Sequence, residues 1–188
     1  MSPRLEKLVP AHPKGVNVSP PDAVSRRAEN WDGLSAEYSE SRDLVPFAYS
    51  IRPTHHLFVC VERGLRRDGE TRVEGLPSST LRNLTRRICV VPAGHQFEGW
   101  HVPSIPVKAT VFHIETDWPL LDPELLTVAA PLRAQLWLDS SSIEATAAKL
   151  KALIGSKDPG DRLYAESLCV VLQHELFRLA CGTVGARR

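Results

Sequence analysis

Cysteine is scarce in this chain and is nowhere arranged for metal binding. The 188-residue sequence contains four cysteines, Cys60, Cys89, Cys169 and Cys181. None belongs to a Cys-x-x-Cys pair or has a histidine at zinc-finger spacing. Cys60 and Cys89 lie in apolar, strand-like runs, where a thiol serves as a small hydrophobic group. We therefore expect buried thiols, no disulfide, no metal site and no cofactor.

An excess of one charge sign and a long hydrophobic run are lacking too. The formal net charge is +1, and acids alternate with bases through most of the chain, so no strong basic surface for nucleic acid is predicted. No apolar run approaches membrane-spanning length, and the first residues lack the apolar core and cleavage site of a signal peptide. These absences favour a cytoplasmic protein without a membrane partner.

Catalytic motifs are also missing. The sequence has no Gly-x-Ser-x-Gly, no phosphate-binding Gly-rich loop and no Gly-x-Gly-x-x-Gly, and its acid pairs lie in charged turns. An enzyme is therefore the weaker hypothesis, and no catalytic residue is assigned.

What the sequence does contain is one core-forming β region behind a polar leader. Residues 1–30 carry five prolines among polar and charged residues and predict a flexible N-terminal arm. Residues 31–116 then alternate short apolar runs with turn residues, which predicts a mostly antiparallel β unit. The strand candidates are 34–39, 46–51, 57–62, 71–74, 88–91 and 108–115.

The side-chain alternation supports these strands. Leu57, Val59 and Val61 should face one way, while Phe58, Cys60 and Glu62 face the other. Turns are expected near residue 64 and at 67–70, 75–77 and 92–94. A small sandwich or barrel is the favoured closure, because it removes exposed strand edges.

Helical patterns take over in residues 117–182, before a short tail at 183–188. Residues 141–144 have the Ser-x-x-Glu form of a capping box, and Gly155 should end that helix. Asp158 is placed to cap a second helix that begins at Pro159. With few residues between them, the two helices should form an antiparallel hairpin.

The second helix carries an apolar stripe of Leu168, Leu172, Leu176 and Leu179. One interpretation is packing against the first helix and the β unit. The other is a dimer interface, because a two-helix hairpin has more apolar surface than one neighbour covers. Both remain open at this point.

The histidines give a weak case for a metal site. Cupin-type barrels often bind a metal through two histidines separated by one residue, a carboxylate and a later histidine. His55 and His56 are adjacent instead, so their rings point to opposite faces of a strand. Glu62 shares a face with His56, so His56, Glu62 and one of His95 or His113 form the metal set to consider.

Residues 92–100 form the densest local motif. They predict a tight turn between two strands, with Phe97 or Trp100 closing one end of the barrel. Alternatively they form a pocket rim, where Trp100 stacks on a ligand and His95 hydrogen-bonds to it. His113 on its strand fits a core or a pocket wall. The candidate ligand-pocket residues are His56, His95, Trp100 and His113.

A series of short sequence motifs, taken in order, resembles a known protein family. In chain order these are Trp-x-Gly-Leu (31–34), Glu-Tyr (37–38), His-His-Leu (55–57), Glu-Arg-Gly (62–64), Asp-Gly-Glu-Thr-Arg (68–72), Gly-Leu-Pro-x-Ser-Thr-Leu-Arg (75–82), Val-Pro-Ala-Gly-His (91–95) and Gly-Trp (99–100). The succession resembles the N-terminal domain of bacterial AraC/XylS-type transcriptional regulators. Residues 162–168, Arg-Leu-Tyr-Ala-Glu-Ser-Leu, look like the start of the last helix of that domain. The resemblance covers about residues 30 to 181.

The resemblance implies a cupin-like β barrel that binds a small effector, followed by helices that dimerise and a separate DNA-binding domain with two helix-turn-helix units. Six residues follow Gly182 here, so we expect no DNA-binding unit of its own and only indirect contact with DNA. The expected fold is α+β, and the expected function is effector sensing with dimerisation, as a homodimer or with related regulators. The alternative is a cupin-like, metal-dependent enzyme acting on a small molecule.

Overall fold

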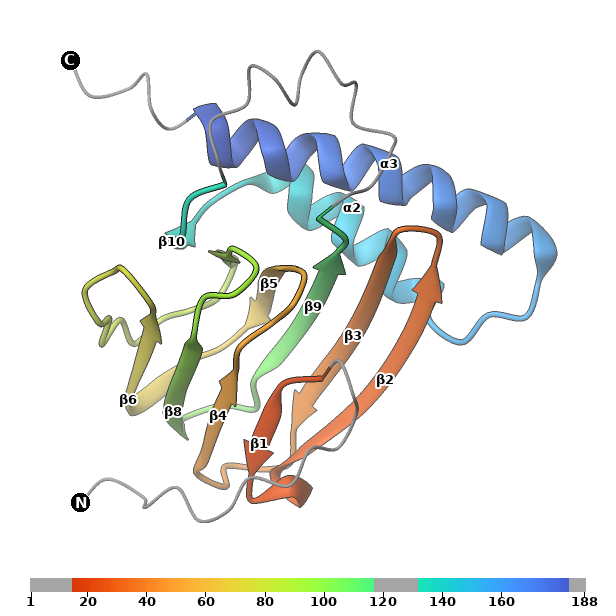
Figure 1. Cartoon of the computed structure of the whole chain (residues 1–188). Helices are drawn as coiled ribbons and strands as arrows, with labels where there is room; N and C mark the ends of the chain where they lie inside the picture. The colour runs from red at the N-terminus through yellow and green to blue at the C-terminus, as the bar shows by residue number, and fades with distance from the viewer. Residues whose placement is uncertain (1–14, 117–131, 183–188) are drawn as a thin grey trace.

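Two antiparallel β-sheets and two helices make up the chain in the computed structural model, which describes residues 15–116 and 132–182 (Figure 1). The expectations for residues 1–14 of the arm, for residues 117–131 of the helical segment and for the tail at 183–188 lie outside the described residues. Figure 1 shows three layers, with α2 and α3 covering the outer face of one sheet and the second sheet facing its inner face. Antiparallel β-structure followed by two helices is confirmed.

The central layer is a six-stranded sheet with the order β10-β7-β5-β9-β3-β2. Its strands are β2 (Val24–Trp31), β3 (Leu34–Ser41), β5 (His56–Arg63), β7 (Arg87–Val91), β9 (Lys108–Ile114) and β10 (Gln135–Leu138). The outer layer is a four-stranded sheet with the order β1-β4-β8-β6. Its strands are β1 (Asn17–Ser19), β4 (Phe47–Ile51), β6 (Arg66–Val73) and β8 (Phe97–Pro103), and a 3-10 turn η1 (Pro21–Ala23) links β1 to β2. Strand pairing does not join the two sheets within the described residues, so they form a sandwich and not a closed barrel.

The central strands of the six-stranded sheet, β5, β7 and β9, are buried on both faces. Leu57, Val59 and Val61 of β5 belong to the core between the sheets, while Phe58 and Cys60 belong to the core under the helices. This confirms the alternation expected from the sequence. It also explains why β5 and β7 read as nearly continuous apolar runs, since a strand covered on both sides has no solvent face.

The helices begin close to where the sequence places them. In α2 (Ser141–Ala152) the cap is Ser140, one residue earlier than expected, and its hydroxyl accepts the Ile143 N–H at 3.4 Å. In α3 (Pro159–Gly182) the Asp158 carboxylate accepts the Gly160 N–H at 2.8 Å, as the predicted cap requires. The two helices run antiparallel along the sheet (Figure 1). The predicted hairpin is therefore confirmed.

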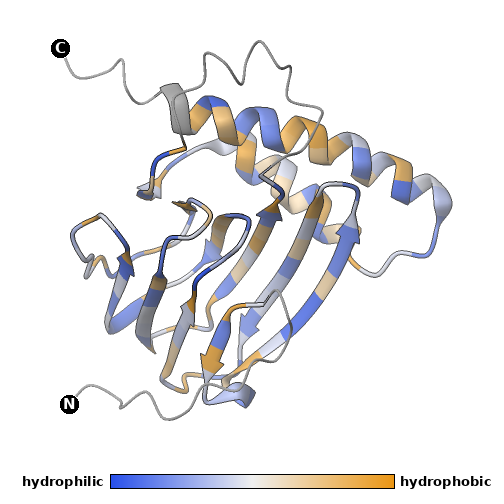
Figure 2. Cartoon of the chain, in the orientation of Figure 1, coloured by the Kyte–Doolittle hydropathy of each residue, from blue (hydrophilic) through white to orange (hydrophobic). Residues whose placement is uncertain are grey.

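Four segments differ from the sequence-based expectation, and one of them is β10 (Gln135–Leu138), a strand within residues 117–182, which were expected to be helical. Residues 15–30 were expected within an arm, yet they form β1, η1 and β2, and β2 pairs with β3 along its whole length. Figure 2 shows that β2 is largely hydrophilic. Because β2 is an edge strand, its sequence lacks the apolar pattern by which a strand is recognised. Residues 67–70 lie within β6 and not in a turn, and residues 97–103 form the strand β8.

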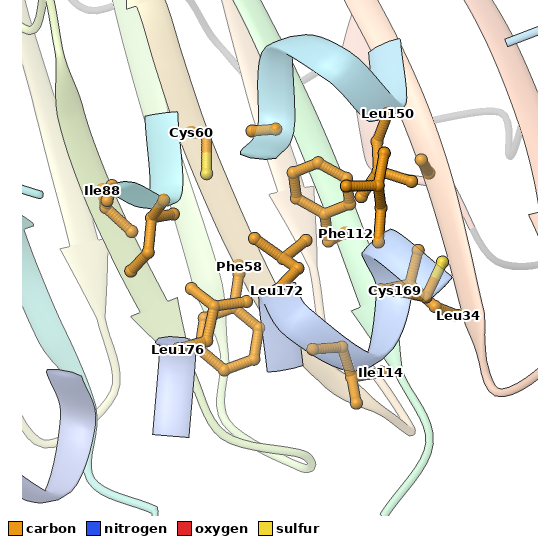
Figure 3. Close-up of a cluster of buried hydrophobic side chains, with 14 of the residues drawn as sticks. Leu34, Phe58, Cys60, Ile88, Phe112, Ile114, Leu150, Cys169, Leu172 and Leu176 are labelled. Atoms are coloured by element: carbon orange, nitrogen blue, oxygen red, sulfur yellow. The ribbon is translucent and has the colours of Figure 1, made fainter. Parts of the chain in front are cut away.

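The leucine stripe of α3 packs inward. Leu168, Leu172 and Leu176 are buried in the core beneath the helices, and Leu179 is partly buried against it. Figure 3 shows Leu172 and Leu176 close to Phe58 of the sheet. The structure therefore corrects the interface assignment of these residues, because a partner cannot reach side chains that the chain's own sheet covers. The exposed large apolar residues in the described part of α3 are Leu163, Tyr164 and Val171.

Candidate functional site between the two sheets

A cavity of about 100 Å³ lies between the two sheets. Its walls are mainly apolar and include Val18, Phe47, Val59, Val61, Val111 and Trp137. Few polar side chains interrupt this wall, and each of them comes from a strand whose inward-facing positions are fixed by the pleat. The site is therefore best described through those polar groups.

A row of three residues crosses the inner face of the four-stranded sheet. Register places Tyr49 of β4 beside Gly99 of β8, and Gly99 beside Thr71 of β6. The Tyr49 phenol lies across Gly99 and its hydroxyl is 3.0 Å from Thr71 Oγ1. A Cβ at position 99 would be 2.5 Å from the Tyr49 hydroxyl, so only glycine leaves room for this crossing. Burial raises the pKa of Tyr49, which keeps the phenol neutral.

His101 occupies the next inward-facing position of β8. Its side chain lines the cavity and is 5% exposed. The ring stacks on Phe47 with centroids 5.2 Å apart and meets Tyr49 edge-on at 5.6 Å. Its Nδ1 atom is buried and has no hydrogen-bond partner among the described residues. Burial, helped by the positive charge of Arg66, lowers the pKa of His101 to about 3, so the ring is neutral at pH 7.

Arg66 is a fully buried cation at the edge of this site. Its Nε donates to the Leu81 carbonyl at 2.7 Å, and its Nη2 donates to the Ser79 carbonyl at 2.9 Å. Its Nη1 donates to Thr71 Oγ1 at 3.2 Å, which links it to the Tyr49 row. Burial lowers the pKa of Arg66. Arg66 therefore fixes the 79–81 segment against β6 and places a positive charge near His101.

Arg26 and Glu37 form a second polar pair in the cavity wall, contributed by β2 and β3. Arg26 Nη1 is 3.4 Å from Glu37 Oε1, and Arg26 Nη2 donates to the Val16 carbonyl at 2.6 Å. The Ser39 hydroxyl donates to the same Glu37 oxygen at 3.1 Å. The charges of this pair are therefore balanced within the wall.

Trp137 joins the cavity to the helical layer. It lines the cavity from β10, and its indole Nε1 donates to Ser79 Oγ at 2.7 Å. Its φ of 62° is unusual for a residue with a bulky side chain and indicates local strain. Helix α2 begins at Ser141, four residues after Trp137. A displacement of Trp137 would therefore move the chain close to the start of that helix.

The candidate pocket residues from the sequence lie outside the lining of this cavity. His56 and His95 both contact Ala93 in the turn between β7 and β8. His56 Nδ1 accepts the Ala93 N–H at 3.1 Å, and His95 Nδ1 is 3.4 Å from the Ala93 carbonyl oxygen. The His56 ring also contacts Phe177 edge-on, with centroids 6.3 Å apart, and burial lowers its pKa. Trp100 lies on the opposite face of β8 from His101, because neighbouring strand residues alternate.

His113 is buried and faces the space between the sheets, as its strand position predicted. It lines a separate cavity of about 20 Å³ that also contacts Glu37. His101 is the residue that the sequence analysis missed. Its signal was the alternation of Phe97, Gly99 and His101, which becomes visible once residues 97–103 are recognised as a strand and not as a turn rim.

The metal set considered from the sequence is not assembled. Glu62 lies at the far end of β5 from His56, where it binds Lys151 Nζ at 2.6 Å and accepts the Thr110 hydroxyl at 3.2 Å. Within residues 15–116 and 132–182, no three histidine, cysteine or acidic side chains are grouped so that they could hold a metal ion.

Three cysteines, Cys60, Cys89 and Cys169, are buried free thiols, while the Cys181 side chain lies outside the described part of the structure. Burial raises the pKa of Cys60 and of Cys169 to about 12. Both thiols are therefore protonated at neutral pH, as expected for cysteines that act as small core residues. No helix in the described part of the chain is both long and apolar enough to span a bilayer.

Comparison with known proteins identifies the fold but not the family. No family model matches the chain, and no curated protein is significantly similar in sequence. The structure of unsaturated fatty acid bound wild-type ToxT from Vibrio cholerae strain SCE256 aligns with 82% of this chain and 57% of the ToxT chain, at 10% identity and a TM-score of 0.55. The chain therefore shares its fold with a little more than half of ToxT.

Two further structures align less closely. The cupin domain of Schizosaccharomyces pombe Cnp3 covers 53% of this chain and 61% of its own length, with 12% identity and a TM-score of 0.38. A putative mannose-6-phosphate isomerase from Ralstonia eutropha JMP134 covers 61% of this chain and 100% of its own length, with 19% identity and a TM-score of 0.41.

The buried, neutral state of His101 predicts a specific loss of stability in acid. The unfolded ring binds a proton below about pH 6.5, whereas the folded ring binds one only near pH 3. Because the unfolded state binds more protons between these values, stability is fully present above pH 6.5 and falls as the pH decreases through this window.

We therefore expect wild type to lose about 2 to 3 kcal/mol more than His101→Phe between pH 7 and pH 4.5 in urea denaturation. Carboxylates titrate in both proteins, so the difference isolates His101, and comparison at pH 7 and pH 8 is the control. Equal losses for the two proteins would contradict the assignment.

Proposed function

We propose that this chain is the effector-binding domain of an AraC-type transcriptional regulator and binds a small molecule in the cavity between its two sheets. The observation that carries the proposal is an apolar cavity of about 100 Å³ whose wall includes His101, a buried ring whose Nδ1 has no hydrogen-bond partner among the described residues. Protein interiors are normally close-packed and their buried polar groups are normally hydrogen-bonded. A cavity that departs from both rules has the character of a ligand site.

Two further observations support a regulator in preference to an enzyme. ToxT, whose fold this chain shares, belongs to the AraC family, and its structure is described as bound to an unsaturated fatty acid. The short sequence motifs between residues 31 and 100 independently resemble the N-terminal domains of that family. On this basis we place the protein in the cytoplasm, where such regulators act.

Trp137 provides the route from the cavity to the helices. A ligand that enters the cavity contacts an indole whose backbone is strained and whose Nε1 binds Ser79. Movement of Trp137 changes the pairing of β10 with β7 and the entry into α2. Occupancy of the cavity can thus alter the helical layer without any contact between ligand and helix.

The helical layer then carries the proposed dimer contact. The exposed apolar side chains of α3, Leu163, Tyr164 and Val171, replace the buried leucines as the proposed interface. Leu163 is 67% exposed and Val171 is 47% exposed, so both are available to a second copy of the chain or to a related regulator.

The cavity proposal is tested by filling the cavity. Val59 lines it from β5, and Val59→Phe should occupy most of the free volume. We expect a mixture of small one-ring compounds to raise the melting temperature of wild type and of the control Val102→Phe, whose position lies on the opposite face of β8 from His101. The mixture should leave Val59→Phe unchanged, because its cavity is occupied. A shift of equal size in Val59→Phe would show that the compounds bind elsewhere.

The dimer proposal is tested by substituting exposed residues of α3, Leu163 and Val171, and comparing them with the buried neighbour Leu172. Sedimentation equilibrium should show a dimer that Leu163→Asp with Val171→Asp dissociates without unfolding. Leu172→Ala, by contrast, should lower the free energy of unfolding by about 2 to 5 kcal/mol because it leaves a hole in the core. A wild-type chain that is monomeric at high concentration would contradict the interface.

A further inference from the structure

We infer that the ligand of this cavity is a small, uncharged, mostly apolar molecule, about the size of one six-membered ring, with a single hydrogen-bonding group directed at the His101 ring in the cavity wall. This inference rests on the proposed function, because it names the chemistry of the molecule that the same cavity takes. It follows from three properties of the cavity, namely its size, its unpaired polar atom and the state of its charged groups.

The size of the cavity limits the part of the ligand that lies between the sheets to one ring. Its volume is about 100 Å³. An engineered protein cavity of about 150 Å³ with apolar walls stays dry and binds benzene. A molecule much larger than a benzene ring would have to displace the wall, which is made of packed strand residues such as Val59, Val61 and Val111.

Among the described residues of the wall, His101 Nδ1 is the buried polar atom that has neither a hydrogen bond nor an ion pair. The other polar groups of the wall are engaged, since the Tyr49 hydroxyl binds Thr71 and the Ser41 hydroxyl accepts the Val107 N–H at 2.8 Å. Arg26 Nη1 makes no hydrogen bond, but its charge is paired with Glu37 at 3.4 Å. A neutral imidazole nitrogen can accept from or donate to one ligand group. Satisfying this buried atom would favour a ligand with such a group over a plain hydrocarbon.

The charged groups exclude an ionic ligand. An anion would lie in a cavity that already holds the Glu37 carboxylate, and the Arg26 guanidinium is occupied by that carboxylate. Arg66 is already bound to two carbonyls and to Thr71, and the low pKa of His101 keeps its ring uncharged. A cation would face the positive charges of Arg26 and Arg66. Burial of a charge without a free counter-charge is costly, so a neutral molecule is favoured.

Three probes that share one ring separate these properties: phenol, benzene and benzoate. Titration calorimetry on wild type should show phenol binding about tenfold more tightly than benzene, with no detectable binding of benzoate. His101→Phe should reduce phenol affinity about tenfold, to the level of benzene, while benzene binding is retained and shows that the cavity is intact. The matched control His55→Phe, which changes a histidine outside the cavity lining, should leave all three affinities unchanged.

The outcomes distinguish this inference from the function on which it rests. Benzoate binding as tightly as phenol, or phenol binding no more tightly than benzene, would overturn the inference and leave the cavity as a ligand site. Phenol affinity that is unchanged in His101→Phe would overturn it as well. Failure of all three probes to bind wild type would also overturn the inference, whereas the proposed function is contradicted separately if ligand mixtures stabilise wild type and Val59→Phe equally.

Discussion

Burial of the central strands of the six-stranded sheet, β5, β7 and β9, on both faces is the constraint on which the rest of this structure depends. Leu57, Val59 and Val61 of β5 face the second sheet, while Phe58 and Cys60 face the helices. Covering one face requires α2 and α3, and covering the other requires the four-stranded sheet. Apolar burial of this kind is the dominant favourable term in folding. Packing is incomplete in the core between the two sheets, and the cavity lies there.

The polar side chains of the four-stranded sheet give the cavity its specific chemistry. Tyr49 can lie across β8 because position 99 is glycine, and the phenol then meets Thr71, which also accepts from Arg66. His101 is the next inward residue along β8, and its Nδ1 is left without a partner. An unpaired buried polar group is costly until it forms a hydrogen bond. The unpaired nitrogen of His101 therefore favours a ligand that brings a hydrogen-bonding group to this ring.

The elements that the sequence predicted are those with a clear period. The alternation in β5 and β9, the caps at Asp158 and near Ser141, and the hairpin of the two helices could all be read from local patterns. The polar edge strand β2 could not, because an edge strand in contact with solvent lacks the apolar alternation that marks a strand. β8 was hidden for a different reason, since its glycine and its neighbouring Pro-Ala-Gly turn have the composition of a loop.

The site was harder to predict than the fold for the same physical reason. His101 becomes a candidate only after β8 is recognised as a strand and its register with Phe47 and Tyr49 is known. His56, His95 and Trp100 were singled out because of their composition in short motifs, and strand geometry places them away from the cavity lining. The inward or outward direction of a side chain on a strand depends on register, and a shift of one residue reverses it.

The central claim is that a small molecule occupies the cavity and binds His101. The most direct test is the ¹⁵N NMR spectrum of the histidine rings at pH 7, recorded with and without phenol and assigned by comparison with His101→Phe. The account predicts a neutral His101 ring whose Nδ1 resonance moves on addition of phenol, while the resonances of His55 and His95 stay in place. A charged ring at pH 7, or an Nδ1 resonance that phenol leaves unchanged, would contradict it.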